Sequence, residues 1–368
     1  MLALCRKVFV PEHADTLRAM RGLAISYDEA GRREEALQLR EEVVALHGKV
    51  STPGDSERRM AMNDLARSYY LAGQRDDGLK LQEQLLALCR KVLAPDDPDT
   101  LLAIENLADA YEYAGRREEA LKLREEALAL RRKGSGPEHA GTLRAMTTLA
   151  DSYGALGRGR EAVAILEQTV EADPKDTIAW LKLASWETWL GLEADYEATR
   201  QRVVQQAEGT DVASTAERAA RVYCLRPSTD PALLAKALGL AQRGVELGKN
   251  DGAFPWYQLA LGIAEYRNGQ FATAERTLAP VEQAAGGQDY LQGSTRLFRA
   301  MSLSRLDRLE EARRLVGQVE AQMPPLPEDE SKPIVVIHDN LIWWLAYKEA
   351  KALIEGPAAS AAKPSASK

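Results

Sequence analysis

The sequence is poor in the residues that large aromatic cores, disulfide frameworks and metal sites use. Its 368 residues include 4 Phe, 4 His and 3 Cys. A hydrophobic total of 45% with so little Phe consists mainly of Ala, Leu and Val, and 28% of residues are charged. This composition favours helices over sheets and excludes both a large all-β fold and a disordered chain. The length alone suggests two or three globular domains.

The sequence also lacks a surplus of positive charge and any long apolar run. The formal net charge is −7, which argues against a nucleic-acid or anionic-membrane partner. No apolar run approaches the ~20 residues that span a bilayer. The first ten residues have no signal-peptide order, and three cysteines without paired spacing indicate a reducing compartment. We therefore expect a cytoplasmic protein.

What the sequence does contain is an internal repeat of 42 residues. The segment AGRREEALQLREE at 30–42 recurs at 114–126 with one difference, and related segments begin at 72 and 156. Glycine and tyrosine keep this spacing at Gly31, Gly73, Gly115 and Gly157 and at Tyr27, Tyr69, Tyr111 and Tyr153. Repeats of this length are typical of solenoids, in which each unit packs only on its neighbours.

Each unit is expected to form two helices. Apolar residues at three- and four-residue spacing, such as Leu107 and Tyr111, predict a first helix that ends at the glycine. The second helix starts with acidic residues and ends with basic ones, which suits the helix dipole. Asp15 and Asp99, each just before Thr-Leu, are predicted to cap the first helices.

These units resemble tetratricopeptide repeats (TPRs), in particular the long-loop units of kinesin light chains. The similarity rests on P-E-H-x-x-T-L before the first helix and A-G-R-x-E-E-A-L across the turn. After Gly157 the spacing shortens to 34 at Gly191, the ordinary TPR length. The resemblance implies an all-α solenoid, a right-handed superhelix of antiparallel helix pairs.

The remainder of the chain departs from this pattern. We predict a regular array over 1–206, degenerate helix pairs over 207–322, a Pro- and acid-rich loop over 323–338, a capping helix over 339–355 and a disordered tail over 356–368. Within the degenerate part, Asp307 replaces the turn glycine. All six tryptophans lie at or after Trp180, and we expect them to be core residues rather than an aromatic ligand cage.

The chain opens in the middle of a unit, because LALCRKVFVP at 2–11 aligns with 86–95. We hypothesise that it is the C-terminal part of a longer protein, or that its start was assigned too late in the gene. The order of the repeats and the final helix resemble the C-terminal arms of large bacterial serine/threonine kinases. A kinase domain would then precede this chain, in which no glycine-rich loop, H-R-D or D-F-G is found.

The sequence offers no constellation for catalysis, a metal or a cofactor. His13 and His139 occupy one repeat position three units apart, so they cannot share a metal ion. Cys5 and Cys89 share a position that elsewhere holds His47 or Arg131, which indicates a surface or boundary site. Cys224 lies in an apolar helix and is predicted to be a core residue. We expect a protein that is not an enzyme and that holds no cofactor.

What remains is surface. In TPR superhelices the first helices line a concave groove where ligands lie, and the resemblance places twelve candidate residues there: Arg18, Arg21, Asn63, Asp64, Arg67, Tyr70, Glu105, Asn106, Asp109, Glu112, Arg144 and Asp151. Asn63 and Asn106 partly match the N-N-L-A motif, whose asparagines can bond a peptide backbone. An ordinary solvated groove is the alternative for each of them.

Two functions stay open from the sequence. The first is a non-catalytic scaffold that binds a peptide or protein segment in the concave groove. The second is a regulatory, sensor or self-association arm of a larger kinase or transcription regulator. Both imply protein partners, and neither implies a nucleic acid or a membrane.

Overall fold

The computed structural model describes residues 10–50, 52, 54–327 and 338–356, and every regular element in that part of the chain is a helix. The described residues separate into two compact units, 1–145 and 146–368. The helices of the first unit are α2 (Ala14–Glu29), α3 (Arg33–Val50), α4 (Ser56–Leu71), α5 (Arg75–Val92), α6 (Pro98–Tyr113) and α7 (Arg117–Ser135). Helix α8 (Ala140–Ala155) runs across the boundary.

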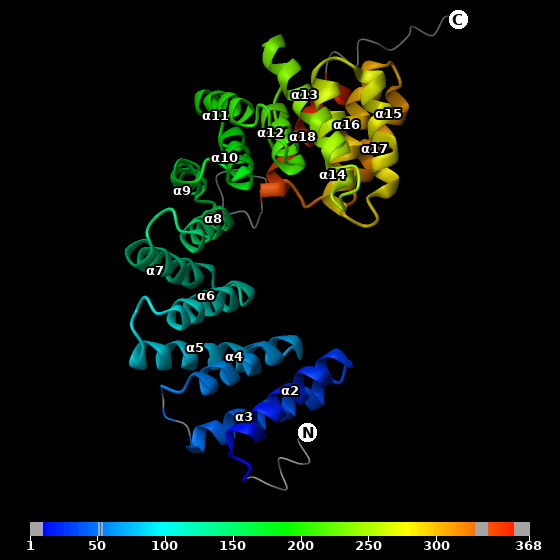
Figure 1. The fold of residues 1–368 in the computed structure, drawn as a ribbon. Coiled ribbons are helices and arrows are strands. Elements are labelled where there is room, and N and C mark those ends of the chain that lie inside the picture. Colours follow the sequence, from blue (N-terminus) through cyan, green and yellow to red (C-terminus); the bar gives the residue numbers. More distant parts are fainter. Residues whose placement is uncertain (1–9, 51, 53, 328–337, 357–368) are drawn as a thin grey trace, which may run out of the picture. The chain divides into compact units, whose positions relative to one another are not determined.

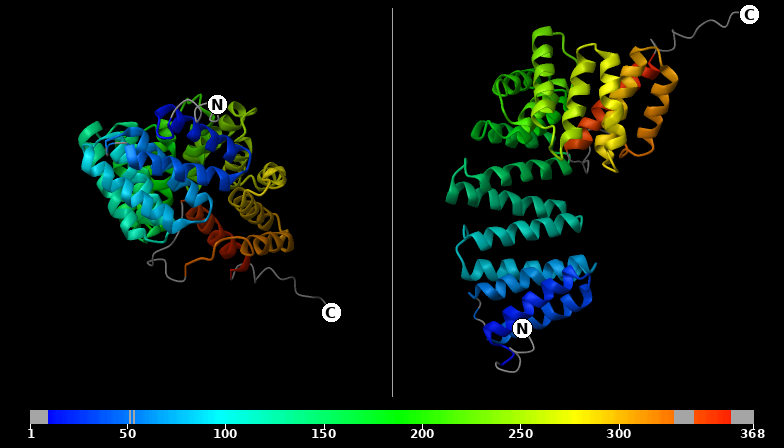
Figure 2. Two further views of the ribbon diagram at one scale, coloured as in Figure 1. Left: turned by 90° about the horizontal axis from the view of Figure 1, so that it is seen from below. Right: turned by 45° about the vertical axis from the view of Figure 1, so that its right-hand side comes forward.

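The first unit is a stack of antiparallel helix pairs, as predicted. Each helix from α2 to α7 packs on the next one in the chain, so the contacts are local in sequence (Figures 1 and 2). The buried residues of the first helices recur at helical spacing, for example Leu101, Ile104 and Ala108 in α6. This is the architecture that the 42-residue period predicts.

The turn that recurs within each 42-residue repeat has a physical explanation. Gly115 follows α6 with a φ of +78°, a conformation in which a side chain would be strained. The guanidinium of Arg116 lies 4.1 Å from the centre of the Tyr111 ring, and its Nε donates to Glu119 at 2.8 Å. The same arrangement occurs at Tyr27, Arg32 and Glu35 and at Tyr153, Arg158 and Glu161. The A-G-R-x-E-E signature therefore encodes a turn fastened by a cation–π contact and an ion pair.

The prediction for the helix caps was wrong by two residues. The N-caps of α2 and α6 are His13 and Asp97, whose side chains accept from the backbone N–H of Asp15 and Asp99. Asp55 caps α4 in the same way. The helices start earlier than predicted because these loop side chains satisfy the first free N–H groups, which places Asp15 and Asp99 in the first turn.

The repeat position shared by Cys89, His47 and Arg131 is not a surface site, which corrects that prediction. Cys89 is 1% exposed and His47 is 4% exposed. Arg131 at this position donates to Glu105 of α6 at 2.7 Å, whereas Cys89 belongs to the apolar core of the first unit. Cys5 lies outside the described residues, and Cys224 is a core residue as predicted.

The second unit contains the remaining helices. They are α9 (Gly159–Ala172), α10 (Thr177–Trp189), α11 (Glu193–Gln206), α12 (Ala213–Cys224), α13 (Pro231–Leu247), α14 (Phe254–Arg267), α15 (Phe271–Ala284), α16 (Asp289–Arg305), α17 (Leu309–Glu320) and α18 (His338–Glu355). Asp307 takes the place of a turn glycine with a φ of +60°, as its alignment suggested. Helix α16 begins at Asp289, and its first turns are already buried at Leu291 and Thr295. The predicted boundary at 206 coincides with the end of α11 and stays a prediction about domain organisation.

Helix α18 does more than cap the last helix pair. It contacts α16 and α17, but it also reaches back to α10, far away in sequence (Figure 2). The ring of Trp344 lies 5.4 Å from that of Trp189, and Trp343 meets Tyr290 edge-on. Helix α18 therefore lies across the first helices of the second unit.

This placement explains why α10 is buried on nearly every side. All residues from Ala179 to Trp189 in α10 are buried, including Trp180 and Trp186. The second helices cover one side and α18 covers the other, so no amphipathic stripe is needed. Five of the six tryptophans are buried, which confirms the expectation that they are core residues.

Candidate functional site

The predicted groove residues come mainly from the first helices of the first unit. Ten of the twelve lie on α2, α4 and α6, while Arg144 and Asp151 lie on α8. The side chains on the side of these helices that other helices leave uncovered are spaced four, three and four residues apart. We call the following set the open face: Arg18, Gly22, Ile25 and Glu29 of α2, Met60, Asp64, Arg67 and Leu71 of α4, and Leu102, Asn106, Asp109 and Tyr113 of α6.

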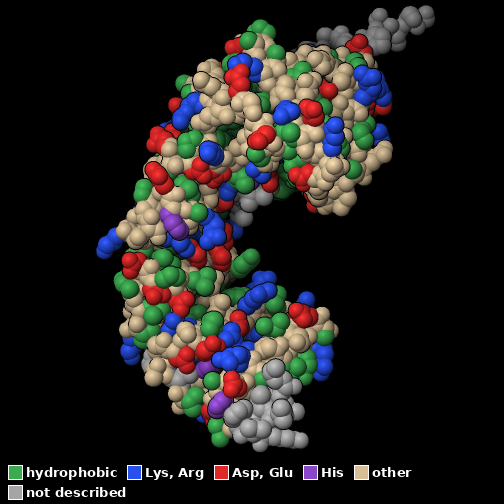
Figure 3. All heavy atoms as spheres, viewed as in Figure 1, with side chains coloured by type: hydrophobic (Ala, Val, Ile, Leu, Met, Phe, Trp, Pro, Cys, Tyr) green, Lys and Arg blue, Asp and Glu red, His purple; other side chains and the backbone are tan. Residues whose placement is uncertain are grey.

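Hydrophobic and charged side chains share this surface. Ile25, Met60, Leu71, Leu102 and Tyr113 are 43–77% exposed, although they are large apolar residues. In the space-filling view, hydrophobic side chains lie among charged side chains of both signs on the first unit (Figure 3). Exposed apolar residues gathered on one face, rather than scattered singly, are typical of a binding surface.

A row of polar residues beneath the open face joins neighbouring repeats of the first unit. Arg21 of α2 donates to Glu57 at 2.7 Å and to Asp64 at 3.0 Å, both on α4. One repeat later, Asn63 of α4 occupies the position of Arg21, and its side chain is hydrogen-bonded to that of Asn106 of α6. Arg21 and Asp64 thus hold α2 against α4. A ligand in the groove would have to share these two side chains with that contact.

The two asparagines form a short ladder. Asn106 Nδ2 donates to Asn63 Oδ1 at 2.9 Å, and Gln82 Nε2 donates to the same oxygen at 3.2 Å. This leaves the Asn63 amide N–H groups and the Asn106 carbonyl oxygen for a ligand. One donor and one acceptor side by side match the peptide backbone.

The acidic candidates of α6 are held by arginines of α7. Arg124, which is 10% exposed, donates to Asp109 at 2.7 Å and also pairs with Glu112. Arg131 holds Glu105 in the same way. The carboxylates are the outer partners in these pairs, with Asp109 59% exposed. The mostly buried arginines therefore fix the orientation of these carboxylates, which face solvent.

Two candidates of α4 differ in their surroundings. Arg67 is exposed on the open face. The hydroxyl oxygen of Tyr70 is buried without a hydrogen-bond partner, and burial raises its pKa to about 12. Gly78 of α5 makes room for this ring, since a Cβ there would lie 3.0 Å from it. Tyr70 consequently packs inside the unit, whereas Arg67 can reach a ligand.

An apolar pocket between α4 and α6 was not predicted from the sequence. It has a volume of about 60 Å³, and its lining includes Met60, Leu85, Cys89, Leu102 and Ala103. Asn63 and Asn106 border it, and so does the ion pair of Arg59 with Asp99, 2.6 Å long. Met60 and Leu102 continue the exposed stripe that contains Asp64, Arg67, Asn106 and Asp109, and their four-residue spacing to Asp64 and Asn106 is the sequence signal for them.

The corresponding surface of the second unit is covered. Helix α18 lies over α12, α14 and α16, where a small cavity of about 20 Å³ remains beneath it. Glu349 of α18 pairs with Arg267 of α14, and the Trp343 ring lies against Gly293 of α16. Asp151, predicted for the groove, accepts from Lys182 of α10 at 2.6 Å. The first helices of this unit offer no open face comparable to that of α2, α4 and α6.

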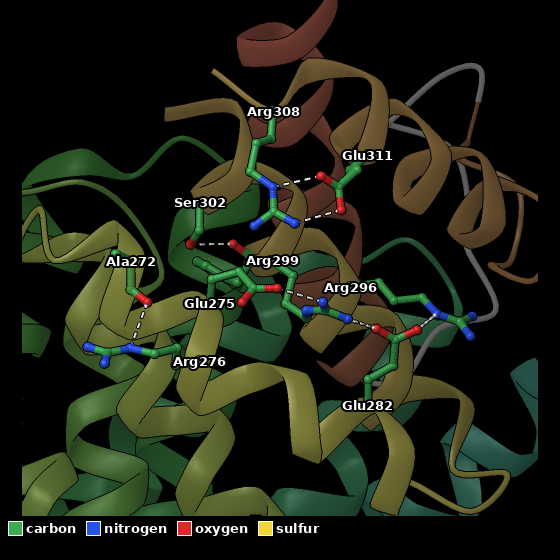
Figure 4. Close-up of polar contacts among 10 residues, drawn as sticks. Ala272, Glu275, Arg276, Glu282, Arg296, Arg299, Ser302, Arg308 and Glu311 are labelled. Atoms are coloured by element: carbon green, nitrogen blue, oxygen red, sulfur yellow. Dashed lines mark hydrogen bonds and ion pairs between the residues drawn. The ribbon is translucent and has the colours of Figure 1, made fainter. Parts of the chain in front are cut away.

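A cluster of charges in the second unit serves packing. Arg299 of α16 donates to Glu275 of α15 at 2.6 Å and also to Glu282, which accepts from Arg296 at 2.8 Å (Figure 4). All four side chains are 12–19% exposed. Because carboxylates and guanidinium groups match within the cluster, it fixes how α15 packs on α16.

Within the described ranges, no three His, Cys, Asp or Glu residues gather as a metal site would require. Burial raises the pKa of the Cys89 thiol, and that of Cys224 rises to about 12. Both thiols are therefore poor nucleophiles. No helix in the described part of the chain is long and apolar enough to cross a membrane.

Comparison with known families gives one consistent result. Family models described as tetratricopeptide repeat match residues 16–51, 57–133, 101–175, 255–280 and 293–318. These ranges cover the helix pairs from α2 to α9 and the pairs α14–α15 and α16–α17. No curated protein sequence matches the chain.

Three solved structures illustrate what the chain is similar to. The apo form of the quorum sensor NprR from B. thuringiensis is 18% identical, with a TM-score of 0.53 over 84% of this chain and 86% of that one. A putative kinesin light chain with TPR-like repeats from Podosopora anserina is 26% identical, with a TM-score of 0.39 over 75% and 98%. A tetratricopeptide repeat protein from Parabacteroides merdae is 12% identical, with a TM-score of 0.44 over 93% and 100%.

Proposed function

Because the chain belongs to the tetratricopeptide repeat family, whose fold generally serves as a protein-interaction scaffold, we propose that it binds a peptide or protein segment on its open face. The proposed site is formed by α2, α4 and α6 of the first unit. The proposal makes the protein a non-catalytic scaffold.

One observation carries this proposal: the first helices are open in one unit and covered in the other. Met60 and Leu102 are 43% and 49% exposed, whereas α18 buries the equivalent surface of α12, α14 and α16. Leaving such apolar groups in water is unfavourable, and burying them in a complex releases roughly 25 cal/mol per Å² of apolar surface. The open face is thus the surface with most to gain from a partner.

The polar groups on this face and directly beneath it suit an extended segment. Asn63 and Asn106 offer one donor and one acceptor, and Arg67 adds a charged donor. An extended peptide exposes backbone N–H and C=O groups that no helix or sheet satisfies, and such groups pair well with amide side chains. Recognition would combine these bonds with burial of apolar side chains.

The test uses peptides selected on the full chain by a display library of random sequences. The triple variant Asn63→Ala, Arg67→Ala, Asn106→Ala should bind the selected peptides at least about tenfold more weakly, a loss of about 1.4 kcal/mol of binding free energy. The helicity of the protein should be unchanged. A double variant on the exposed side of α5, Asp76→Ala with Lys80→Ala, is the matched control. Equal affinities for the triple variant and the control would refute the site.

A second function, a regulatory or self-association arm, is favoured by the position of α18. This helix already binds the first helices of its own chain, for example through Glu349 and Arg267. Such an arm would act by contacts within or between copies, in a parent protein that includes a kinase or transcription regulator. Light scattering separates the two, because a concentration-dependent dimer favours the arm and a strict monomer favours the scaffold.

The location stays part of the proposal. Cys89 and Cys224 are free and buried, and no disulfide joins described residues. Free thiols agree with a reducing, cytoplasmic environment. Fractionation of cells that produce the protein would test this.

A further inference from the structure

The pocket on the open face has the size and polarity of a site for one aliphatic side chain. Its volume is about 60 Å³, smaller than the ~150 Å³ of an apolar cavity that holds a benzene ring. Met60 and Leu102 form its walls at the surface, and Leu85, Ala103 and Cys89 lie deeper. The flexible Met60 can close over an inserted group. The space therefore suits an aliphatic side chain better than a larger aromatic one.

The ion pairs beside the pocket turn their carboxylates outward. Asp99 is 49% exposed while its partner Arg59 is 9% exposed, and Asp109 is 59% exposed while Arg124 is 10% exposed. Arg59 binds Asp99 through one carboxylate oxygen, Oδ2, and Arg124 binds Asp109 through Oδ1. The buried guanidinium groups therefore orient each carboxylate, and its second oxygen can accept from a ligand.

The charges on α4 and α6 favour a basic partner. Helix α6 carries carboxylates on Asp99, Glu105, Asp109 and Glu112 and no lysine or arginine. The arginine partners of Asp99, Asp109 and Glu105 come from other helices and are only 9–14% exposed, so the carboxylates are the charges that face solvent. Asp64 is already shared with Arg21. The two carboxylates available to a ligand thus lie on either side of the pocket and the asparagine ladder, both on α6.

The spacing along α6 sets the register of the ligand. Asp99 and Asp109 are ten residues apart, which at 1.5 Å per residue is about 15 Å along the helix. An extended peptide rises about 3.3 Å per residue, so four or five of its residues span this distance. Leu102 at the pocket lies between the two carboxylates, closer to Asp99.

We infer that the open face recognises an extended segment with one aliphatic side chain between two basic residues that are four or five positions apart. The aliphatic side chain fills the pocket between Met60 and Leu102, and the basic side chains pair with Asp99 and Asp109. The peptide backbone bonds to Asn63 and Asn106. This inference rests on the proposed function and adds the chemical class of its ligand.

The probe is a fluorescein-labelled peptide with a Lys-Ser-Leu-Ser-Lys core in a Gly-Ser context, titrated with the full chain and followed by anisotropy. Matched probes replace both Lys by Glu, Leu by Ser, or Leu by Trp. Each replacement should weaken binding at least about tenfold. Binding of the Lys probe should fall with added salt, because its ion pairs are exposed.

Variants of the protein then locate the contacts. Met60→Ser with Leu102→Ser should remove the preference for Leu over Ser in the probe. The control, Ile25→Ser with Leu71→Ser, changes two exposed apolar residues of the same face outside the pocket and should keep the preference. Since all four side chains are exposed, the variants should fold, which circular dichroism verifies.

The outcomes separate this inference from the proposed function. Equal binding of the Lys and Glu probes, tighter binding of the Trp probe, or no binding up to millimolar concentration overturns the inference. Display-selected peptides that depend on Asn63, Arg67 and Asn106 but lack the aliphatic and basic pattern overturn it too, and leave the proposed function standing. Loss of that dependence overturns both.

Discussion

Replacing Gly293 by alanine tests whether α18 lies on α16 as described. A Cβ at Gly293 would lie 2.1 Å from Cζ2 of Trp343 and 2.3 Å from Cε2. Trp343 is 4% exposed and meets Tyr290 edge-on at 6.2 Å between ring centres. The ring therefore cannot turn away without disturbing its neighbours, and α18 has to shift.

Two opposing effects set the size of the change. Alanine is the better helix former, which favours the variant by roughly 0.5–1 kcal/mol. Overpacking of a close-packed core costs about 1–3 kcal/mol. We expect Gly293→Ala to lower the free energy of unfolding of the second unit by about 1–2 kcal/mol, despite the gain in helix propensity.

The assay is urea unfolding followed by tryptophan fluorescence. All six tryptophans lie in the second unit, so this signal reports that unit without a contribution from the first. The Trp343→Phe change in the Gly293→Ala background should recover part of the loss, because the smaller ring removes the clashing atoms.

The control is Gly317→Ala in α17, where a Cβ meets no atom within 4 Å. This variant should gain roughly 0.5–1 kcal/mol from helix propensity alone. If Gly293→Ala stabilises the protein as Gly317→Ala does, Trp343 does not lie on Gly293 and the placement of α18 is refuted.

Three further predictions follow from other side chains. Burial raises the pKa of Glu187 from 4.5 to about 7, so the folded chain keeps a proton that the unfolded chain releases and stability falls as pH rises from 4.5 to 7. Glu187→Gln should remove this fall, so its free energy of unfolding should exceed that of the natural chain by about 3 kcal/mol at pH 8 and equal it at pH 4. Equal pH profiles of the two proteins in urea unfolding would contradict this prediction. Asp97→Ala should cost the first unit about 1 kcal/mol by circular dichroism through loss of the α6 cap, whereas Asp96→Ala should be neutral, and equal costs would refute the cap. Cys224 should react with iodoacetamide only after the second unit unfolds, and rapid native labelling would contradict its burial.

Much of the fold could be predicted because its contacts are local. The turn at Tyr111, Gly115 and Arg116 joins residues that are only a few positions apart in the sequence, so a short signature describes it fully. The caps were misplaced by two residues because several polar side chains in the loop could serve, and only the backbone path selects Asp97 over Asp99.

The candidate site was predicted in outline and not in detail. The resemblance placed Asn63 and Asn106 on first helices, and the structure brings them into contact. The pocket at Met60 and Leu102 escaped prediction because its existence depends on how far α4 and α6 stand apart. That distance follows from the packing of several side chains together, which no single segment specifies.

The sequence by itself determined the repeat, the helix pairs and the family, because each unit buries its apolar face against the next one along the chain. Only the tertiary structure decided which face stays open. The apolar residues of α18 require burial, but nothing in 338–355 states that α10, about 150 residues away, is one of its partners. Long-range packing thus covers the first helices of the second unit, whereas one side of α2, α4 and α6 stays exposed.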